Sequence, residues 1–166
     1  MSEVREAKTG DVEAFGRFIL KAWDEAGPGA LGWTGATDEN VSELASPEFL
    51  SPLIEREGIA LFLAWDRGEV VGFASNMRVD DETVELSGIV VLESMTGRGV
   101  GSRLLDSSLQ AAERDGYDRV IVETEVFNER AIGFYRSRGF EDGGKRVTEV
   151  EGERVELVEL SLLLRT

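Results

Sequence analysis

The feature that most constrains this chain is a glycine-rich loop at residues 96–101, TGRGVG. An apolar run rich in β-branched residues precedes it, at residues 86–92, and is typical of a buried strand. After the loop, apolar side chains recur at helical spacing, at Val100, Leu104, Leu105, Leu109 and Ala112. The glycines therefore lie where a strand passes into a helix.

A glycine loop in this position leaves backbone N–H groups unobstructed at the first turn of a helix. These N–H groups have no partner within the helix, and the helix dipole is positive at this end, so both favour an anion. The loop predicts a site for a phosphate or pyrophosphate. The alternative is that the glycines only permit a tight turn, and the loop by itself does not decide between the two.

The composition excludes several kinds of site. The chain has 166 residues and contains neither cysteine nor histidine. A disulfide framework, a thiolate nucleophile, a histidine-dependent catalytic triad and the usual zinc site are therefore excluded. We expect one domain over residues 1–166, without a metal ion. Because there is no apolar signal-peptide core and no apolar run that could span a bilayer, we also expect a cytoplasmic protein.

The charge balance is strongly acidic, with a net charge of −15 at pH 7. This charge argues against a nucleic acid partner. An acidic surface with few lysines resembles that of proteins from salt-loving microorganisms, in which net charge maintains solubility. The alternative is a groove that attracts cationic substrates. The acids are spread along the whole chain, which favours the halophilic interpretation.

Hydrophobic periodicity and turn signals predict an order of strand, two helical segments, three strands, helix, strand, helix and two strands. Residues 27–35, GPGALGWTG, predict a loop that is either a lid over an acceptor or a plain connector. The expected strands are 4–7, 59–65, 69–77, 83–92, 119–124 and a closing hairpin over 146–164, and the expected helices are 11–23, one or two within 37–57, 101–114 and 128–138.

A second motif, at residues 128–140, reads N-x-x-A-x-x-F-Y-x-x-x-G-F. Together with the element order and the glycine loop, it resembles the GCN5-related N-acetyltransferase (GNAT) superfamily over nearly the whole chain. The second motif matches that family at every fixed position. In the loop, Gly99 and Gly101 match the family pattern Q/R-x-x-G-x-G/A, whereas Thr96 replaces the Gln or Arg. This departure implies a weaker side-chain contact to a pyrophosphate, which Arg98 or Arg103 could make up.

The resemblance implies an α/β fold with a central mixed, mostly antiparallel sheet of about seven strands and helices on both faces. It also implies an enzyme that moves an acetyl group from acetyl-CoA, as co-substrate, to a primary amine by direct attack. The expected partner is an amine acceptor, either a small molecule or a protein N-terminus. No nucleic acid and no membrane is expected, and a homodimer is left open.

The same resemblance assigns roles to individual residues. The backbone N–H of Val91 would donate to the thioester oxygen, Asn128 would bond to the pantetheine arm, and Tyr135 would donate a proton to the departing thiolate. Asn128 is also a good helix N-cap, and Tyr135 could be a core residue. The backbone of the loop would hold the pyrophosphate, through Arg98, Gly99, Val100, Gly101 and Ser102.

The general base is predicted less directly. Glu85 lies on the strand before the loop, at the position where some family members keep a carboxylate that relays a proton through water. The alternative is a plain surface glutamate. Glu123, on the neighbouring strand, is the reserve candidate.

Other classes of protein fit the sequence less well. The loop with Glu123 resembles a dinucleotide fingerprint, but Ser102 replaces the third glycine and too little chain follows for a doubly wound sheet. A P-loop requires Gly-Lys-Ser/Thr, whereas Gly101 is followed by Ser102 and Arg103. A non-catalytic acyl-CoA sensor of the same fold is the stronger alternative, and Tyr135 argues against it because a binding module has no thiolate to protonate.

Overall fold

A seven-stranded sheet forms the centre of the computed structural model, which describes residues 2–27, 36–150 and 152–164. The strand order is β1-β2-β3-β4-β5-β7-β6, and all neighbours are antiparallel except β4 and β5, which are parallel. The predicted mixed, mostly antiparallel sheet is therefore confirmed. The strands are β1 (Glu3–Glu6), β2 (Ile59–Asp66), β3 (Glu69–Arg78), β4 (Thr83–Val91), β5 (Arg119–Glu125), β6 (Glu141–Val150) and β7 (Glu153–Leu163).

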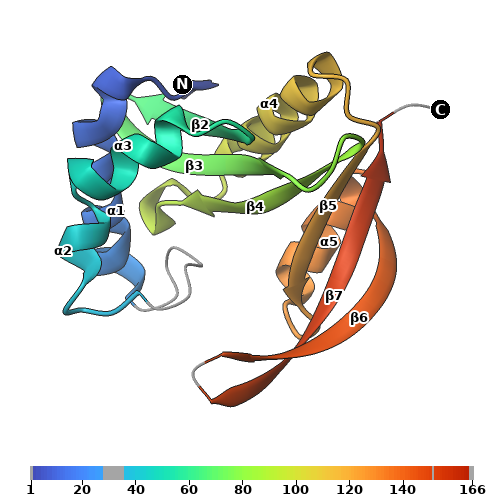
Figure 1. The fold of residues 1–166 in the computed structure, drawn as a ribbon. Helices are drawn as coiled ribbons and strands as arrows, with labels where there is room; N and C mark the ends of the chain where they lie inside the picture. Colours follow the sequence, from blue (N-terminus) through green and yellow to red (C-terminus); the bar gives the residue numbers. More distant parts are fainter. Residues whose placement is uncertain (1, 28–35, 151, 165–166) are drawn as a thin grey trace.

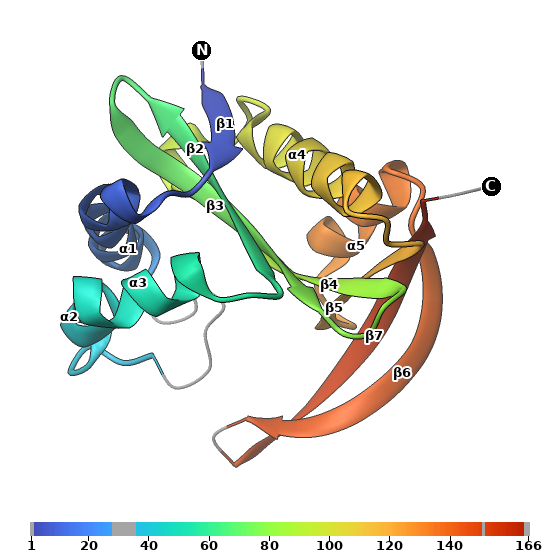
Figure 2. The same ribbon diagram turned by 45° about the horizontal axis from the view of Figure 1, so that its top comes forward.

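Helices cover both faces of the sheet (Figures 1 and 2). On one face lie α1 (Val12–Ala26), α2 (Val41–Leu44) and α3 (Pro47–Glu55). On the other face lie α4 (Val100–Arg114) and α5 (Glu129–Ser137). Among the described residues, no helix is long and apolar enough to cross a membrane.

Two elements extend beyond their predicted bounds by more than one residue. β6 begins at Glu141 rather than at residue 146, because the ladder crosses the glycine pair at 143–144 through a register shift, and such a bulge tolerates glycines that a regular strand does not. α1 continues to Ala26, and the N–H of Gly27 closes it by donating to the carbonyl of Trp23 at 2.7 Å. Apart from Gly27, the predicted loop at 27–35 lies outside the described residues.

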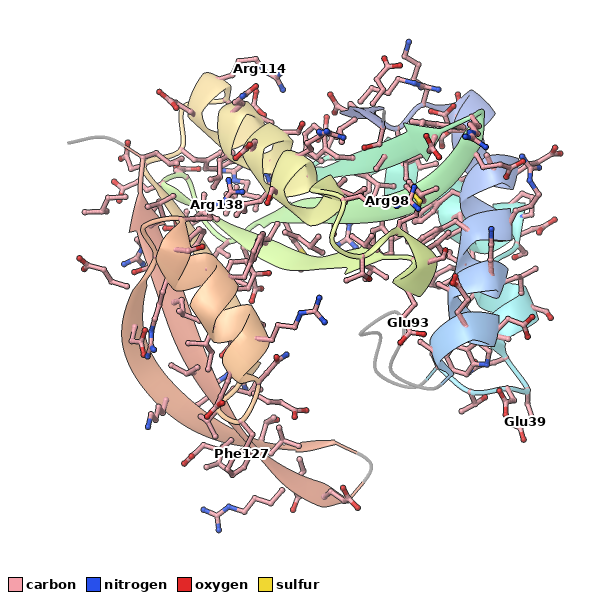
Figure 3. All side chains as sticks on the ribbon, turned by 180° about the vertical axis from the view of Figure 1, so that it is seen from behind. Glu39, Glu93, Arg98, Arg114, Phe127 and Arg138 are labelled. Carbon is pink, nitrogen blue, oxygen red and sulfur yellow. The ribbon has the colours of Figure 1, made fainter. Side chains whose placement is uncertain are left out.

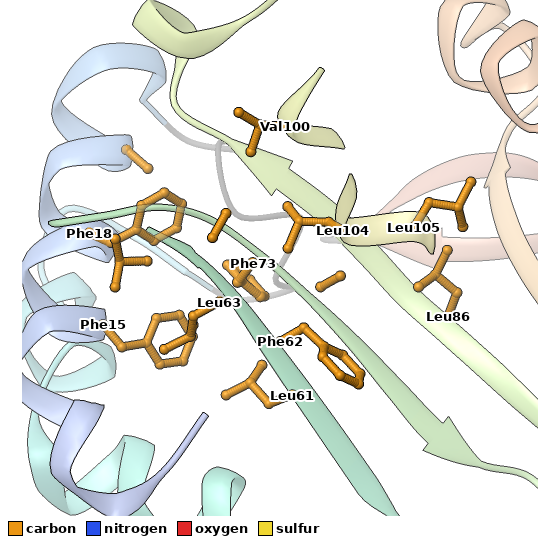
Figure 4. Packing of buried hydrophobic residues seen from close by; sticks show 14 of the residues in the cluster. Phe15, Phe18, Leu61, Phe62, Leu63, Phe73, Leu86, Val100, Leu104 and Leu105 are labelled. Atoms are coloured by element: carbon orange, nitrogen blue, oxygen red, sulfur yellow. The ribbon is translucent and has the colours of Figure 1, made fainter. Parts of the chain in front are cut away.

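The core forms a layer on each face of the sheet (Figure 4). On the α1 face, the rings of Phe15 and Phe18 pack edge-on against Phe73 of β3, with centroids 5.1 and 5.8 Å apart. On the opposite face, Leu104 and Leu105 of α4 are fully buried against the sheet. Because each such side chain stabilises the fold by about 1.5–3 kcal/mol when buried, the two layers hold α1 and α4 firmly on opposite faces.

The two central strands separate soon after they pair. β4 and β5 pair only over residues 83–85 and 119–121. Next along β4, a bulge at Ser87 shifts the register against β3, and Gly88 follows with a φ of 143°. A bulge bends its strand, so the rest of β4 runs away from β5 and leaves a gap in the middle of the sheet (Figure 1).

Packing between α1 and α2 can be tested by substitutions at two helical glycines. A Cβ at Gly16 of α1 would overlap the carbonyl oxygen of Ala45, whereas a Cβ at Gly133 of α5 meets no atom within 4 Å. Since alanine favours a helix over glycine by up to about 1 kcal/mol, Gly133→Ala should stabilise the protein. Gly16→Ala should instead destabilise it by roughly 1–3 kcal/mol through overpacking.

Urea unfolding of the two variants and the parent protein measures this difference. A Gly16→Ala protein as stable as Gly133→Ala would contradict the close approach of α1 to α2.

Candidate active site

The end of β4 presents to the gap backbone N–H groups that have no partner among the residues that the structure describes. The N–H of Leu92 donates to the carbonyl of Val71 on β3 at 3.0 Å. In an antiparallel ladder, alternate residues direct their N–H groups to the neighbouring strand, so those of Ile89 and Val91 point away from β3. Because β5 has already diverged, both N–H groups face the gap. Val91 is the donor that the sequence resemblance implies, and the register gives Ile89 the same orientation.

The glycine loop leads directly into α4. Gly99 is the N-cap, in the left-handed conformation with a φ of 80°, and no side chain in the described part of the chain caps the helix. The first turn contains no acidic residue, whereas the first turns of the other α-helices do, with Glu13, Glu43, Glu48 and Glu129. The start of α4 therefore keeps N–H donors and a positive dipole end with no carboxylate in its own first turn, which favours an anion, although Glu93 lines the adjoining cavity.

A cavity of about 530 Å³ joins the end of β4, the glycine loop and α5. This volume is in the range of small-molecule and cofactor sites. Its lining contains most of the site residues predicted from the sequence, namely Val91, Gly99, Val100, Gly101, Ser102, Asn128 and Tyr135.

Two residues of α5 face this cavity in roles that also stabilise the fold. Asn128 is the N-cap of α5, and its Oδ1 accepts from the N–H of Ala131 at 3.1 Å. This bond uses only the oxygen of the amide, so the amide N–H groups stay available toward the cavity. The ring of Tyr135 packs between Phe134 and Phe140, with centroids 5.3 and 5.4 Å apart. Burial raises the pKa of Tyr135 to about 12, so its hydroxyl stays protonated across the neutral range.

The structure indicates a different arginine near the predicted anion site from the two that the sequence suggested. Arg98 lies on the α1 side of the loop and lines a separate small cavity (Figure 3). The guanidinium of Arg103 donates to the backbone carbonyl of Ser2 at 3.3 Å. Arg130, in the first turn of α5, lines the large cavity instead. It occupies a variable position of the 128–140 motif, so the motif alone did not single it out.

Glu85 lies where the gap begins, on the face of the sheet that α1 covers, opposite the large cavity. It is the last residue of β4 that pairs with β5, and it lies directly opposite Met77 of β3. Desolvation by burial raises its pKa, as does the negative charge of Glu123 and Glu159, while Arg146 lowers it. The net effect is a raised pKa, which suits a group that accepts and releases a proton.

Glu123, the reserve candidate, is held differently. Arg146 of β6 forms a bidentate pair with it, with Nε–Oε2 and Nη2–Oε1 distances of 2.6 and 2.8 Å. These hydrogen bonds lower the pKa of Glu123. A carboxylate engaged in this way is a poorer proton acceptor than Glu85.

Comparisons of the sequence agree on one family. The Acetyltransferase (GNAT) family matches residues 22–140. An uncharacterised N-acetyltransferase of Mycobacterium tuberculosis is 33% identical over 109 residues, which cover 66% of this chain and 67% of the relative. An L-methionine sulfoximine/L-methionine sulfone acetyltransferase of Pseudomonas aeruginosa is 30% identical over 151 residues, which cover 87% of this chain and 83% of the relative.

Solved structures with the same fold include two acetyltransferases. The ribosomal-protein-S18-alanine N-acetyltransferase of Escherichia coli has a TM-score of 0.74 and 21% identity, covering 100% of this chain and 96% of that chain. The PaiA N-acetyltransferase of Thermoplasma acidophilum, solved in complex with coenzyme A, has a TM-score of 0.69 and 19% identity, covering 96% and 98%. At these sequence identities, the similarity shows only that this chain has the same fold as these two proteins.

The electrostatics around Glu85 predict how its titration responds to its neighbours. Its carboxyl carbon should titrate at a higher pH than that of an exposed glutamate, as followed by carbon-13 NMR. Glu123→Gln should lower the pKa of Glu85, because it removes a repelling charge. Arg146→Gln should raise it, because it removes the attracting charge. A Glu85 titration that neither substitution moves would contradict this arrangement.

Proposed function

The chain belongs to the acetyltransferase (GNAT) family and is an acyltransferase, and we propose that it moves an acetyl group from acetyl-CoA to a primary amine. One observation carries this proposal: a single cavity joins the uncapped start of α4, the open N–H groups of β4 and the hydroxyl-bearing Tyr135. Together these supply an anion site, donors to a carbonyl oxygen and a donor to a leaving group.

The chemistry of the cavity fits coenzyme A. The pyrophosphate would accept from the N–H groups at the start of α4, with Arg130 supplying a positive charge nearby. The pantetheine arm, an extended amide chain, would pair with the exposed edge of β4 beyond the bulge, as a further strand pairs with a sheet edge. The amide of Asn128 would donate to that arm from the opposite wall.

Each protein group at the gap has a separate role in the proposed transfer. Acetyl-CoA supplies the acetyl thioester. The N–H groups of Ile89 and Val91 donate to its carbonyl oxygen, where negative charge develops. The carbon–nitrogen bond forms as the carbon–sulfur bond breaks. Glu85 takes the proton from the amine nitrogen through water, and the hydroxyl of Tyr135 donates to the departing sulfur.

The alternative is an acyl-CoA sensor of the same fold without catalysis. Two features favour the enzyme. Tyr135 lines the cavity and keeps its proton. Glu85, whose pKa is raised, lies at the edge of the same gap. A binding module has no need of a proton donor and a proton acceptor on opposite sides of one gap. Release of free CoA thiol from acetyl-CoA in the presence of an amine tests the difference directly.

Replacing Tyr135 tests the proton donor. Tyr135→Phe keeps the packing against Phe134 and Phe140 but removes the hydroxyl, so kcat should fall on the order of 10²-fold. The affinity for acetyl-CoA, measured by calorimetry, should change little. Equal turnover by the variant and the parent protein would remove Tyr135 from the mechanism.

Replacing Gly101 tests the anion site independently of catalysis. A Cβ at this position meets only the methyl groups of Ile89 and Val91, at 3.9 Å, so the backbone tolerates a side chain. Gly101→Glu would bring a negative charge to the start of α4 and should abolish CoA binding by calorimetry, with an unchanged circular dichroism spectrum. Gly101→Gln is the matched control, and it should lose less affinity. Undiminished CoA binding by Gly101→Glu would refute the site.

A further inference from the structure

A second cavity, of about 230 Å³, lies on the α1 face of the sheet. Its walls are largely apolar and include Phe15 of α1, Leu61 of β2 and Phe73 of β3. Three polar side chains also line it, Arg56 after α3, Ser75 of β3 and Ser87 at the bulge of β4. At about 30 Å³ per water molecule it has room for roughly eight water-sized groups, the size of one small metabolite.

This cavity adjoins the proposed base. Met77, which lies directly opposite Glu85 in the β3–β4 ladder, lines it. Ser87, two residues beyond Glu85 on the same strand, lines it as well. Side chains directly opposite on neighbouring strands share one face of the sheet, so Glu85 faces the same side as the cavity. A molecule in the cavity therefore has access to the edge of the gap.

Arg56 is placed at the far wall. Its carbonyl accepts from the N–H of Ile59 at 3.4 Å, and Ile59 pairs with Met77, which in turn pairs with Glu85. Ile59 and Glu85 are thus two strand spacings apart, about 10 Å. The Arg56 and Glu85 side chains, with one small molecule between them, can fill that span.

Arg56 is exposed to solvent at the cavity wall and is one of several described arginines without a carboxylate partner. No carboxylate pairs with its guanidinium among the residues that the structure describes. Seven other arginines do form such pairs, namely Arg5, Arg17, Arg78, Arg114, Arg136, Arg138 and Arg146. In a chain with a net charge of −15, a cation without a carboxylate partner at a cavity wall favours an anionic ligand group.

We propose that this cavity binds the acetyl acceptor, and that the acceptor is an α-amino acid with an apolar side chain, an inference that rests on the proposed acetyl transfer. The guanidinium of Arg56 binds the carboxylate, and the apolar side chain lies against Phe15 and Phe73. The α-amine is then directed toward Glu85 and the gap. The products are the N-acetylated amino acid and the free CoA thiol.

The test compares amino acids with amines that lack only the carboxylate. Leucine, methionine and phenylalanine are paired with isopentylamine, 3-(methylthio)propylamine and phenethylamine, and thiol release from acetyl-CoA is measured. We expect the amino acids to be the better acceptors. Arg56→Gln should raise KM for the amino acids on the order of 10- to 100-fold, with little effect on kcat or on the matched amines. Arg154→Gln, at an exposed arginine of β7, is the control and should behave as the parent protein.

Binding without turnover separates this inference from the proposed function. Leucine should bind to the CoA-loaded protein by calorimetry, and Arg56→Gln should weaken that binding. If carboxylate-free amines or polyamines are acetylated as well as the amino acids, and Arg56→Gln changes nothing, the cavity assignment is overturned while acetyl transfer stands. If leucine binds through Arg56 but no acceptor releases thiol, the binding site stands and the proposed transfer is refuted.

Discussion

The short parallel pairing between β4 and β5 is the constraint on which the candidate site depends. Only residues 83–85 of β4 pair with β5, because the bulge at Ser87 then bends the strand away. A sheet normally satisfies its backbone groups through its neighbours, so a central strand that loses its neighbour exposes donors in the interior of the fold. The N–H groups of Ile89 and Val91 are the result. They give the cavity a polar edge, although the β4 side chains that line it, Ile89 and Val91, are apolar.

Charge is distributed unevenly in a strongly acidic protein. Acidic residues stand in the first turns of α1, α2, α3 and α5, where they stabilise a helix, but α4 has none. Arg130 and Arg56 are exposed arginines that each line one of the two cavities, and neither has a carboxylate partner among the described residues. The two cavities are thereby favourable to anions in a molecule whose overall field repels them.

The two cavities lie on opposite faces of one sheet, and β4 lines both of them, with Ile89 and Val91 in one and Ser87 in the other. Tyr135, on the α5 side, has its pKa raised by burial and remains a donor. Glu85, on the α1 side, has its pKa raised by burial and by neighbouring carboxylates and is the better acceptor. In the proposed transfer, the proton donor and the proton acceptor therefore lie on opposite faces of a single sheet, as proton transfer in two directions requires.

Local patterns in the sequence determined much of this protein. Periodicity predicted the order of helices and strands. The glycines at 99 and 101 predicted the open start of α4, and the motif at 128–140 predicted that Asn128 and Tyr135 share one element. Each of these features depends on residues close together in the chain, where backbone conformation and side-chain spacing are set directly.

Only the tertiary structure decided which distant residues meet. Arg130 rather than Arg98 or Arg103 reaches the large cavity, because α5 packs beside the gap while Arg103 is held by Ser2. Glu123 is engaged by Arg146 because β7 brings β6 to it, and no sequence spacing indicates that pair. The bulge at Ser87 depends likewise on the register of β4 against β3. The physical reason is common to all three: the partner of a side chain or strand is chosen by long-range packing, which local pattern does not encode.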